Sequence, residues 1–137
     1  MKTKLFTICI LLFTSQLSAE SQFTWEHITT SNDGGSTFYG DKNSIRKNSS
    51  GNYIVWVLVN NKTGKYEGES RIISQEHDCA QLRYRWVFVE AYRNHYAKGE
   101  EYLSMDTEEI KSLGYYKWRY PKPNSNEYHQ VNWVCQN

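Results

Sequence analysis

The sequence has few cysteines, few prolines and no long hydrophobic run. It contains three cysteines and two prolines among 137 residues. Its main uncharged apolar stretch, residues 5–13, is about half as long as the roughly 20 residues that a membrane-spanning helix needs. No Gly-x-Ser-x-Gly, His-Glu-x-x-His or phosphate-loop motif occurs either. These absences predict a chain with no stable membrane span and no catalytic activity.

The N-terminus is typical of a cleavable export signal. Two lysines precede the apolar stretch, and small and polar residues follow it as far as Ala19. We therefore expect residues 1–19 to be the signal and residues 20–137 to be the mature domain. A lipid-attachment signal would need a cysteine just after the apolar stretch, whereas Cys9 lies inside it. The alternative is an uncleaved N-terminal anchor.

The mature chain is close to electrically neutral. Two lysines leave with the signal, so 14 basic residues face 15 acidic ones and the net charge is −1 with neutral histidines. Binding of duplex nucleic acid depends on many cationic contacts to phosphates, so no nucleic acid partner is predicted. The remaining 118 residues match the usual size of a single domain.

Two cysteines, Cys79 and Cys135, remain after the signal. An even number of cysteines in an exported protein favours a disulfide between them. The bond would close a loop of more than fifty residues, which the chain-entropy model values at about 4 kcal/mol. A redox-active pair would be expected at Cys-x-x-Cys spacing, so we interpret this disulfide as structural.

Alternating apolar and polar residues predict an antiparallel sheet. Strands are expected at residues 23–29, 52–60, 66–74, 82–92 and 115–121. The second of these is apolar on both faces, as expected of a central strand that is covered on both sides. Segments rich in glycine, asparagine and serine separate the strands and indicate turns.

Two helices are expected in the last third of the chain. A short one would begin at Asp106 or Thr107 and stop at Gly114. A C-terminal one would follow Asn124, which has capping-box spacing to Glu127. Its apolar face carries residues at i, i+3 and i+7: Tyr128, Val131 and Cys135. The predicted fold is therefore α+β, a single antiparallel sheet of about six strands with a C-terminal helix tethered to one face by the disulfide.

The histidines and acidic residues do not predict a metal, cofactor or catalytic site. The four histidines are at least eighteen residues apart, which argues against a metal site: His27, His77, His95 and His129. Glu76–Asp78 are consecutive, so their side chains cannot converge on one atom in an extended chain, and we interpret them as a polar loop before Cys79. His95, beside two tyrosines, is the one candidate for a haem ligand.

One candidate binding patch combines arginine, lysine and tyrosine. Arg83 and Arg85 share a face of their predicted strand, as do Lys117 and Arg119 of theirs, and Tyr84 lies between the first two. Arginine and tyrosine are enriched where protein interfaces concentrate their binding energy. The alternative is an ordinary solvated sheet face with alternating charge.

Several stretches taken together resemble the surface-adhesin E family. They are Trp25, IVWVLVNN at 54–61, ESRIISQEHDC at 69–79, Gly99, KWRYPKPNS at 117–125, and Val134 with Cys135. The resemblance covers nearly all of the mature chain. It implies a six-stranded antiparallel sheet with a disulfide-tethered C-terminal helix, a dimer, and non-enzymatic binding of host vitronectin, laminin and plasminogen. It also implies haem binding for the founding type, although we predict no cofactor here.

These observations lead to one functional hypothesis and one alternative. The hypothesis is a non-catalytic exported binding domain that binds a host matrix or serum protein. The alternative is a periplasmic inhibitor or immunity-type protein that blocks a partner enzyme. Without a lipid-attachment cysteine, the periplasm or secretion is expected rather than the outer surface. A homodimer is expected from the resemblance and from the high aromatic content, 15% of residues.

Overall fold

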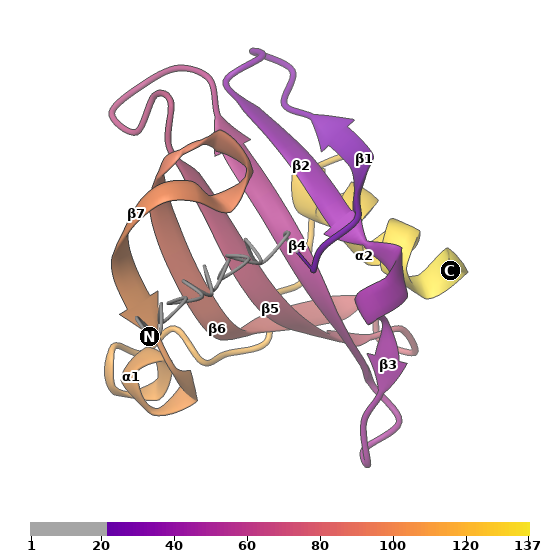
Figure 1. The fold of residues 1–137 in the computed structure, drawn as a ribbon. Coiled ribbons are helices and arrows are strands. Elements are labelled where there is room, and N and C mark those ends of the chain that lie inside the picture. The colour runs from indigo at the N-terminus through magenta and orange to yellow at the C-terminus, as the bar shows by residue number, and fades with distance from the viewer. Residues whose placement is uncertain (1–21) are drawn as a thin grey trace, which may run out of the picture.

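The computed structural model describes residues 22–137, which form one antiparallel sheet and two α-helices (Figure 1). The strands are β1 (Trp25–Thr30), β2 (Ser36–Asp41), β3 (Arg46–Lys47), β4 (Tyr53–Asn61), β5 (Ser70–Asp78), β6 (Arg83–Asn94) and β7 (Lys98–Met105). They lie in the order β1-β2-β4-β5-β6-β7, with β3 paired to the start of β4. The predicted α+β fold is confirmed, with seven strands instead of about six. The predicted signal, residues 1–19, lies outside the described residues.

The short helix α1 (Thr107–Ser112) begins at the predicted cap. The Asp106 side chain accepts a hydrogen bond from the backbone N–H of Glu109, and the Glu109 side chain accepts one from the N–H of Asp106. This reciprocal capping box satisfies two backbone donors that the first helical turn leaves free. Two short 3₁₀ segments, η1 (Lys42–Ser44) and η2 (His95–Ala97), complete the elements.

The C-terminal helix α2 (Asn126–Gln136) begins one residue later than predicted. Ser125 is its N-cap, and its hydroxyl oxygen accepts a hydrogen bond from the N–H of Tyr128. Asn124 was the wrong cap, because its φ of 63° is left-handed, whereas a capping residue is normally extended. No helix within residues 22–137 is long and apolar enough to cross a membrane.

The disulfide joins the end of the sheet to α2. Cys79 directly follows β5, Cys135 lies in the last turn of α2, and the two are bonded as predicted. Figure 1 shows α2 behind the sheet, and we call this side of the sheet the helix face. Of the predicted apolar face of α2, Val131 is buried and Tyr128 is only half-buried. Val134, which was not predicted, is also buried and packs against Val55 and Val57.

The helix face carries two clusters of the hydrophobic core. The first is the contact of α2 with β4. The second places Ile110 of α1 against one valine or isoleucine from each of three strands: Val59, Ile73 and Val89. Ile110 is fully buried, so the short helix α1 is held mainly by this one side chain.

The predicted strand at 115–121 was wrong. Only Arg119 pairs, in an isolated bridge with Tyr84 of β6. The alternating aromatic residues there pack against arginine side chains instead of extending the sheet: Trp118 lies under Arg83 and Arg85, and Tyr116 under Arg85. The alternation was therefore real, but its cause was stacking on arginine rather than strand pairing.

The strand predicted at 66–74 begins and ends later than expected. β5 starts at Ser70, and residues 62–69 form the loop that leads into it from β4. Glu76–Asp78, predicted as a loop, are the buried last residues of β5. Their polar side chains are tolerated inside the fold because each finds a hydrogen-bond partner.

Candidate binding site

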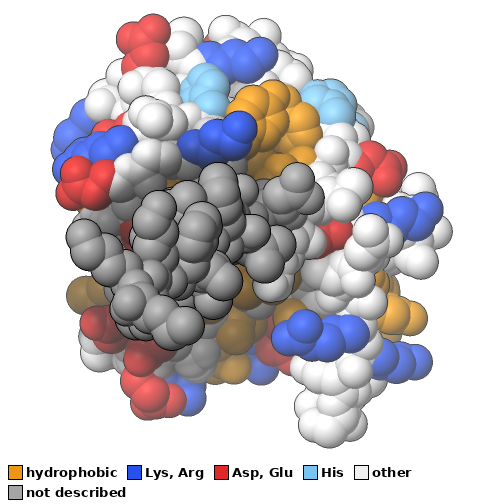
Figure 2. Space-filling view, viewed as in Figure 1, with side chains coloured by type: hydrophobic (Ala, Val, Ile, Leu, Met, Phe, Trp, Pro, Cys, Tyr) orange, Lys and Arg blue, Asp and Glu red, His pale blue; other side chains and the backbone are white. Residues whose placement is uncertain are grey.

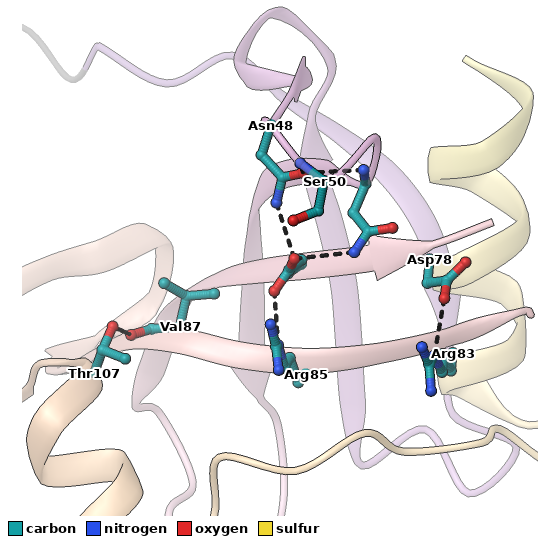
Figure 3. Close-up of polar contacts among 9 residues, drawn as sticks. Asn48, Ser50, Asp78, Arg83, Arg85, Val87 and Thr107 are labelled. Atoms are coloured by element: carbon teal, nitrogen blue, oxygen red, sulfur yellow. Dashed lines mark hydrogen bonds and ion pairs between the residues drawn. The ribbon is translucent and has the colours of Figure 1, made fainter. Parts of the chain in front are cut away.

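Arg83 and Arg85, two residues of the predicted patch, form ion pairs with carboxylates of β5 (Figure 3). Arg83 Nε lies 2.9 Å from Asp78 Oδ2, and Arg85 Nε lies 2.6 Å from Glu76 Oε2. The guanidinium carbons lie 4.3 and 4.2 Å from the centre of the Trp118 ring. Charge-assisted bonds and stacking of this kind hold both arginines in place.

Glu76 is the centre of this polar network. Its Oε1 accepts hydrogen bonds from Asn48 Nδ2 at 2.8 Å and Asn52 Nδ2 at 3.0 Å, and its Oε2 pairs with Arg85. Burial would raise the pKa of Glu76, but the hydrogen bonds from Asn52, Arg85 and Asn48 outweigh it and hold the pKa below its usual range. The carboxylate is therefore ionised at neutral pH, and the network links β5 and β6 to the loop before β4.

The other three residues of the predicted patch lie in different surroundings. Tyr84 is buried, and its backbone exchanges two hydrogen bonds with Arg119. The Arg119 guanidinium stacks on Trp86, 4.5 Å from the ring centre, so it lies on the helix face, whereas Arg83 and Arg85 point the opposite way. Lys117 is exposed. The five residues therefore do not form one continuous surface, and their part in binding stays a prediction.

The face opposite α2 carries a row of large aromatic side chains. This front face is turned toward the viewer in Figure 1. Trp56 and Phe88 both lie opposite Ser74 in the sheet and so share a face, with ring centres 5.9 Å apart. Phe23, just before β1, lies 5.6 Å from Trp56 and stacks on Trp25 at 4.8 Å. Three strands and the N-terminal segment thus contribute to one aromatic surface.

A second aromatic group extends this surface toward η2. The hydroxyls of Tyr39 and Tyr96 are 3.2 Å apart, and each ring meets a histidine edge-on: His27 beside Tyr39 and His95 beside Tyr96. Figure 2 shows a hydrophobic patch between two histidine side chains on this face. Burial and the Tyr96 hydrogen bond raise the pKa of Tyr39 to about 12, so its hydroxyl remains protonated and can donate.

A cavity of about 500 Å³ lies between these groups. Apolar side chains line it from Phe23, Trp56 and Ile72, and polar ones from Glu90, Tyr92 and Lys98. The Tyr92 hydroxyl donates a 2.6 Å hydrogen bond to Glu90 Oε2. A mostly apolar cavity with a few polar groups is the usual form of a ligand-binding site. We call it the front-face cavity.

The segment η2, which borders the cavity, has a strained backbone. Tyr96 and Ala97 have φ values of 61° and 56°, a region that residues other than glycine rarely adopt. Two buried side chains hold them there: Asn60 Oδ1 accepts from the Tyr96 N–H, and Ser70 Oγ from the Ala97 N–H, each at 2.9 Å. Strain that surrounding structure maintains is concentrated at functional sites, and here it fixes Tyr96 at the rim of the cavity.

The histidines of the described part of the chain lie apart from one another. Within residues 22–137 no group of three or more His, Cys, Asp or Glu side chains is placed to hold a metal ion. His95 Nε2 lies 2.8 Å from the carbonyl oxygen of Asn61 and must donate to it. That nitrogen is therefore not free to ligate haem iron.

The residues of the front-face cavity were missed by the sequence reasoning. Alternation in the strands at 52–60 and 82–92 does place Trp56 and Phe88 on one face, but only the arginines and their neighbouring tyrosine and lysine were interpreted as a binding patch. No sequence pattern indicated that Tyr96 borders a cavity, since its left-handed backbone is imposed by hydrogen bonds to side chains of distant strands.

Comparisons with known proteins agree with the architecture. Residues 25–136 match the family model of surface-adhesin protein E. The crystal form II structure of Haemophilus influenzae protein E is similar with a TM-score of 0.54 and 14% sequence identity, over 80% of this chain and 87% of that chain. At that identity the likeness establishes the fold alone. A search of curated proteins gave no match. Because the family model matches most of its length, the chain belongs to the surface-adhesin protein E family.

Proposed function

We propose that this protein is an exported, non-catalytic binding domain that contacts a protein ligand through the front-face cavity and its aromatic rim. The observation that carries the proposal is the gathering of Trp56, Tyr92 and Tyr96 around one cavity with Glu90 and Lys98 at its edge. Tryptophan and tyrosine are the side chains on which interface energy concentrates. The cavity also offers both signs of charge, which can orient a peptide chain.

The proposed ligand is a host matrix or serum protein. Membership of an adhesin family supports a binding role, and the predicted export signal would bring the mature chain to the periplasm or the outside of the cell. The rigid placement of Tyr96 supports binding further, because a side chain that is already ordered loses less conformational entropy when a ligand arrives.

Capture from two sources tests this function. The mature chain, residues 20–137, is immobilised and exposed separately to solubilised host matrix with serum and to a bacterial lysate. We expect a matrix or serum protein to be retained by the wild type and by Tyr66→Ala, and to be lost with Tyr96→Ala. Tyr66 is a matched control because it is a similarly exposed tyrosine, 50% against 44%, in the loop before β5. Retention of a bacterial hydrolase, with nothing retained from matrix or serum, would instead support the inhibitor or immunity role.

We further propose that the mature chain forms a homodimer. Several large apolar side chains remain exposed on the described part of the chain, among them Leu82, Leu103 and Tyr120, and association would cover some of them. Sedimentation equilibrium at tens of micromolar should show a dimer, whereas a single monomeric species would contradict this.

A further inference from the structure

Arg71 and Arg119 lack the carboxylate partners that other arginines of this protein have. Arg83, Arg85 and Arg93 each form an ion pair with a carboxylate at 2.6 to 3.1 Å. Among residues 22–137 neither Arg71 nor Arg119 does so, and the Nε of each is buried without a hydrogen-bond partner. Both side chains are nevertheless half-buried on the helix face. Two half-buried guanidinium groups without anions are unusual, because charged groups removed from water are normally paired.

Both arginines line one groove beside α2, which runs from the segment 119–122 onto the helix face of the sheet. The groove consists of two adjoining cavities that share Tyr84 and Glu127. The larger, about 260 Å³, is lined by Arg119, Tyr120, Pro121, Lys122 and Ser125 as well. The smaller, about 130 Å³, extends over the sheet to Arg71 past Phe38, Ile73 and Trp86. The groove is therefore cationic at both ends, with apolar side chains in the smaller cavity and with Tyr84 and Glu127 where the two cavities meet.

The charges of the groove favour an anion. Arg71, Arg119 and Lys122 are basic, and Glu127 is the one acidic side chain in the two linings. Arg119 is held in position by its stacking on Trp86 and by the backbone bridge to Tyr84. A cation fixed in this way binds a carboxylate without losing further side-chain freedom. Tyr84 lines both cavities together with Glu127, and its hydroxyl has no hydrogen-bond partner among the described side chains.

We propose that this helix-face groove binds an acidic peptide segment of a partner protein, with carboxylates at Arg119 and Lys122 and at Arg71. The cationic side chains lie in two different cavities, Arg71 in one and Arg119 with Lys122 in the other, which suits an extended chain with acidic side chains at intervals better than a single small anion. The site is distinct from the front-face cavity because it lies on the opposite side of the sheet. It goes beyond the function proposed above and does not depend on that function.

Titration with blocked hexapeptides tests the proposal directly. The ligands are acetyl-hexaglutamate-amide, the matching hexaglutamine peptide, and glutarate as a free carboxylate. The readout is the NMR signal of the Arg71 and Arg119 Nε–H groups, which burial should protect from exchange, together with affinity from calorimetry. We expect the glutamate peptide to shift both signals and to bind at least tenfold more tightly than the glutamine peptide or glutarate. Raising the salt concentration should weaken the binding.

Variants assign the effect to the groove. Arg119→Gln and Lys122→Gln should each weaken hexaglutamate binding, by about tenfold for Arg119, as expected for one charge-assisted hydrogen bond. Glu127→Gln should strengthen it, since the opposing carboxylate is gone. Lys117→Gln removes an exposed lysine five residues from Lys122 and outside the groove linings, and should change nothing. Lys122 is exposed, so its variant will fold even if Arg119→Gln does not.

Three results would overturn the proposal. One is equal affinity for the glutamate and glutamine peptides, or no binding of either. Another is an equal loss of affinity in Lys117→Gln and Lys122→Gln, which would indicate general charge attraction. The last is binding of glutarate as tight as that of the peptide, which would make the site one for small carboxylates rather than for an acidic chain.

Discussion

His77 is fully buried on the helix face of β5, where its ring stacks on Tyr84 and its Nε2 lies 2.9 Å from Gln75 Oε1. Gln75 in turn bonds Gln130 of α2. No carboxylate compensates a charge here, so burial lowers the pKa of His77 to about 3. In the folded protein the ring therefore stays neutral near pH 6.5, where the same histidine in the unfolded chain takes up a proton.

Acidification should therefore destabilise the protein through His77. A histidine titrates near 6.5 when unfolded and near 3 here, so the unfolded state binds the extra proton and stability falls as the pH drops below 6.5. Between pH 7 and 5 we expect a loss of about 2 kcal/mol from this residue. Urea denaturation at both pH values should show the loss in the wild type but not in His77→Phe, which cannot titrate. Glu76, with its lowered pKa, contributes only at more acidic pH. Parallel pH profiles for the two proteins would refute this explanation.

Single residues also show where the sequence was sufficient and where it was not. The pairing of Cys79 with Cys135 followed from their being the only two cysteines after the predicted signal. The burial of Glu76 could not be predicted, because the three side chains that stabilise its charge come from distant positions: Asn48, Asn52 and Arg85.

Among the elements, α2 is joined covalently to the residue after β5 by the disulfide. Cys135→Ser should lower the free energy of unfolding by about 2 to 5 kcal/mol, the usual range for a disulfide in a small exported domain. Loss of the bond should also expose Val55 and Val57 and increase binding of a hydrophobic dye. Cys79→Ser should behave alike, and the double variant should be little worse than either, since one bond is removed in all three.

Thiol titration of the unfolded, unreduced wild type should detect no free sulfhydryl in the mature chain. Melting midpoints equal to that of the wild type would show that the bond contributes no stability.

A glycine on β2 sets how closely α2 approaches the sheet. A Cβ added at Gly40 would overlap the Trp133 ring of α2. Gly40→Ala should therefore destabilise the fold by about 2 kcal/mol, a typical cost of overpacking. In a Trp133→Ala background the same change should cost little, because the ring is absent. A double-mutant cycle by urea denaturation measures the difference, and an equal cost in both backgrounds would mean that the contact is not the cause.

The elements divide into those that the sequence specifies and those that the fold imposes. β4 was predictable because its valines and isoleucine make it apolar on both faces. β7 was not, since KGEEYLSM has few apolar positions and forms a strand only because β6 offers it an edge to pair with. The stretch 115–121 shows the reverse case, in which aromatic alternation predicted a strand but stacking on arginine decided the structure.

At the scale of the whole molecule, the sheet separates two different surfaces. The front face presents the aromatic cavity, and the helix face presents the cationic groove beside α2. Neither surface could be read from the sequence, because each is assembled from at least three segments that are distant along the chain. The resemblance to the surface-adhesin E family predicted the fold and the disulfide, but not the location of either site.

The most direct test of the binding role is the affinity of the mature chain for vitronectin, laminin and plasminogen, measured by biolayer interferometry for the wild type, Tyr96→Ala and Tyr66→Ala. We expect the wild type and Tyr66→Ala to bind at least one of these proteins equally well. Tyr96→Ala should bind that protein at least tenfold more weakly, as expected when an aromatic interface residue is truncated, while its melting midpoint stays close to that of the wild type. Binding that is absent for all three proteins, or that Tyr96→Ala leaves unchanged, would contradict the account.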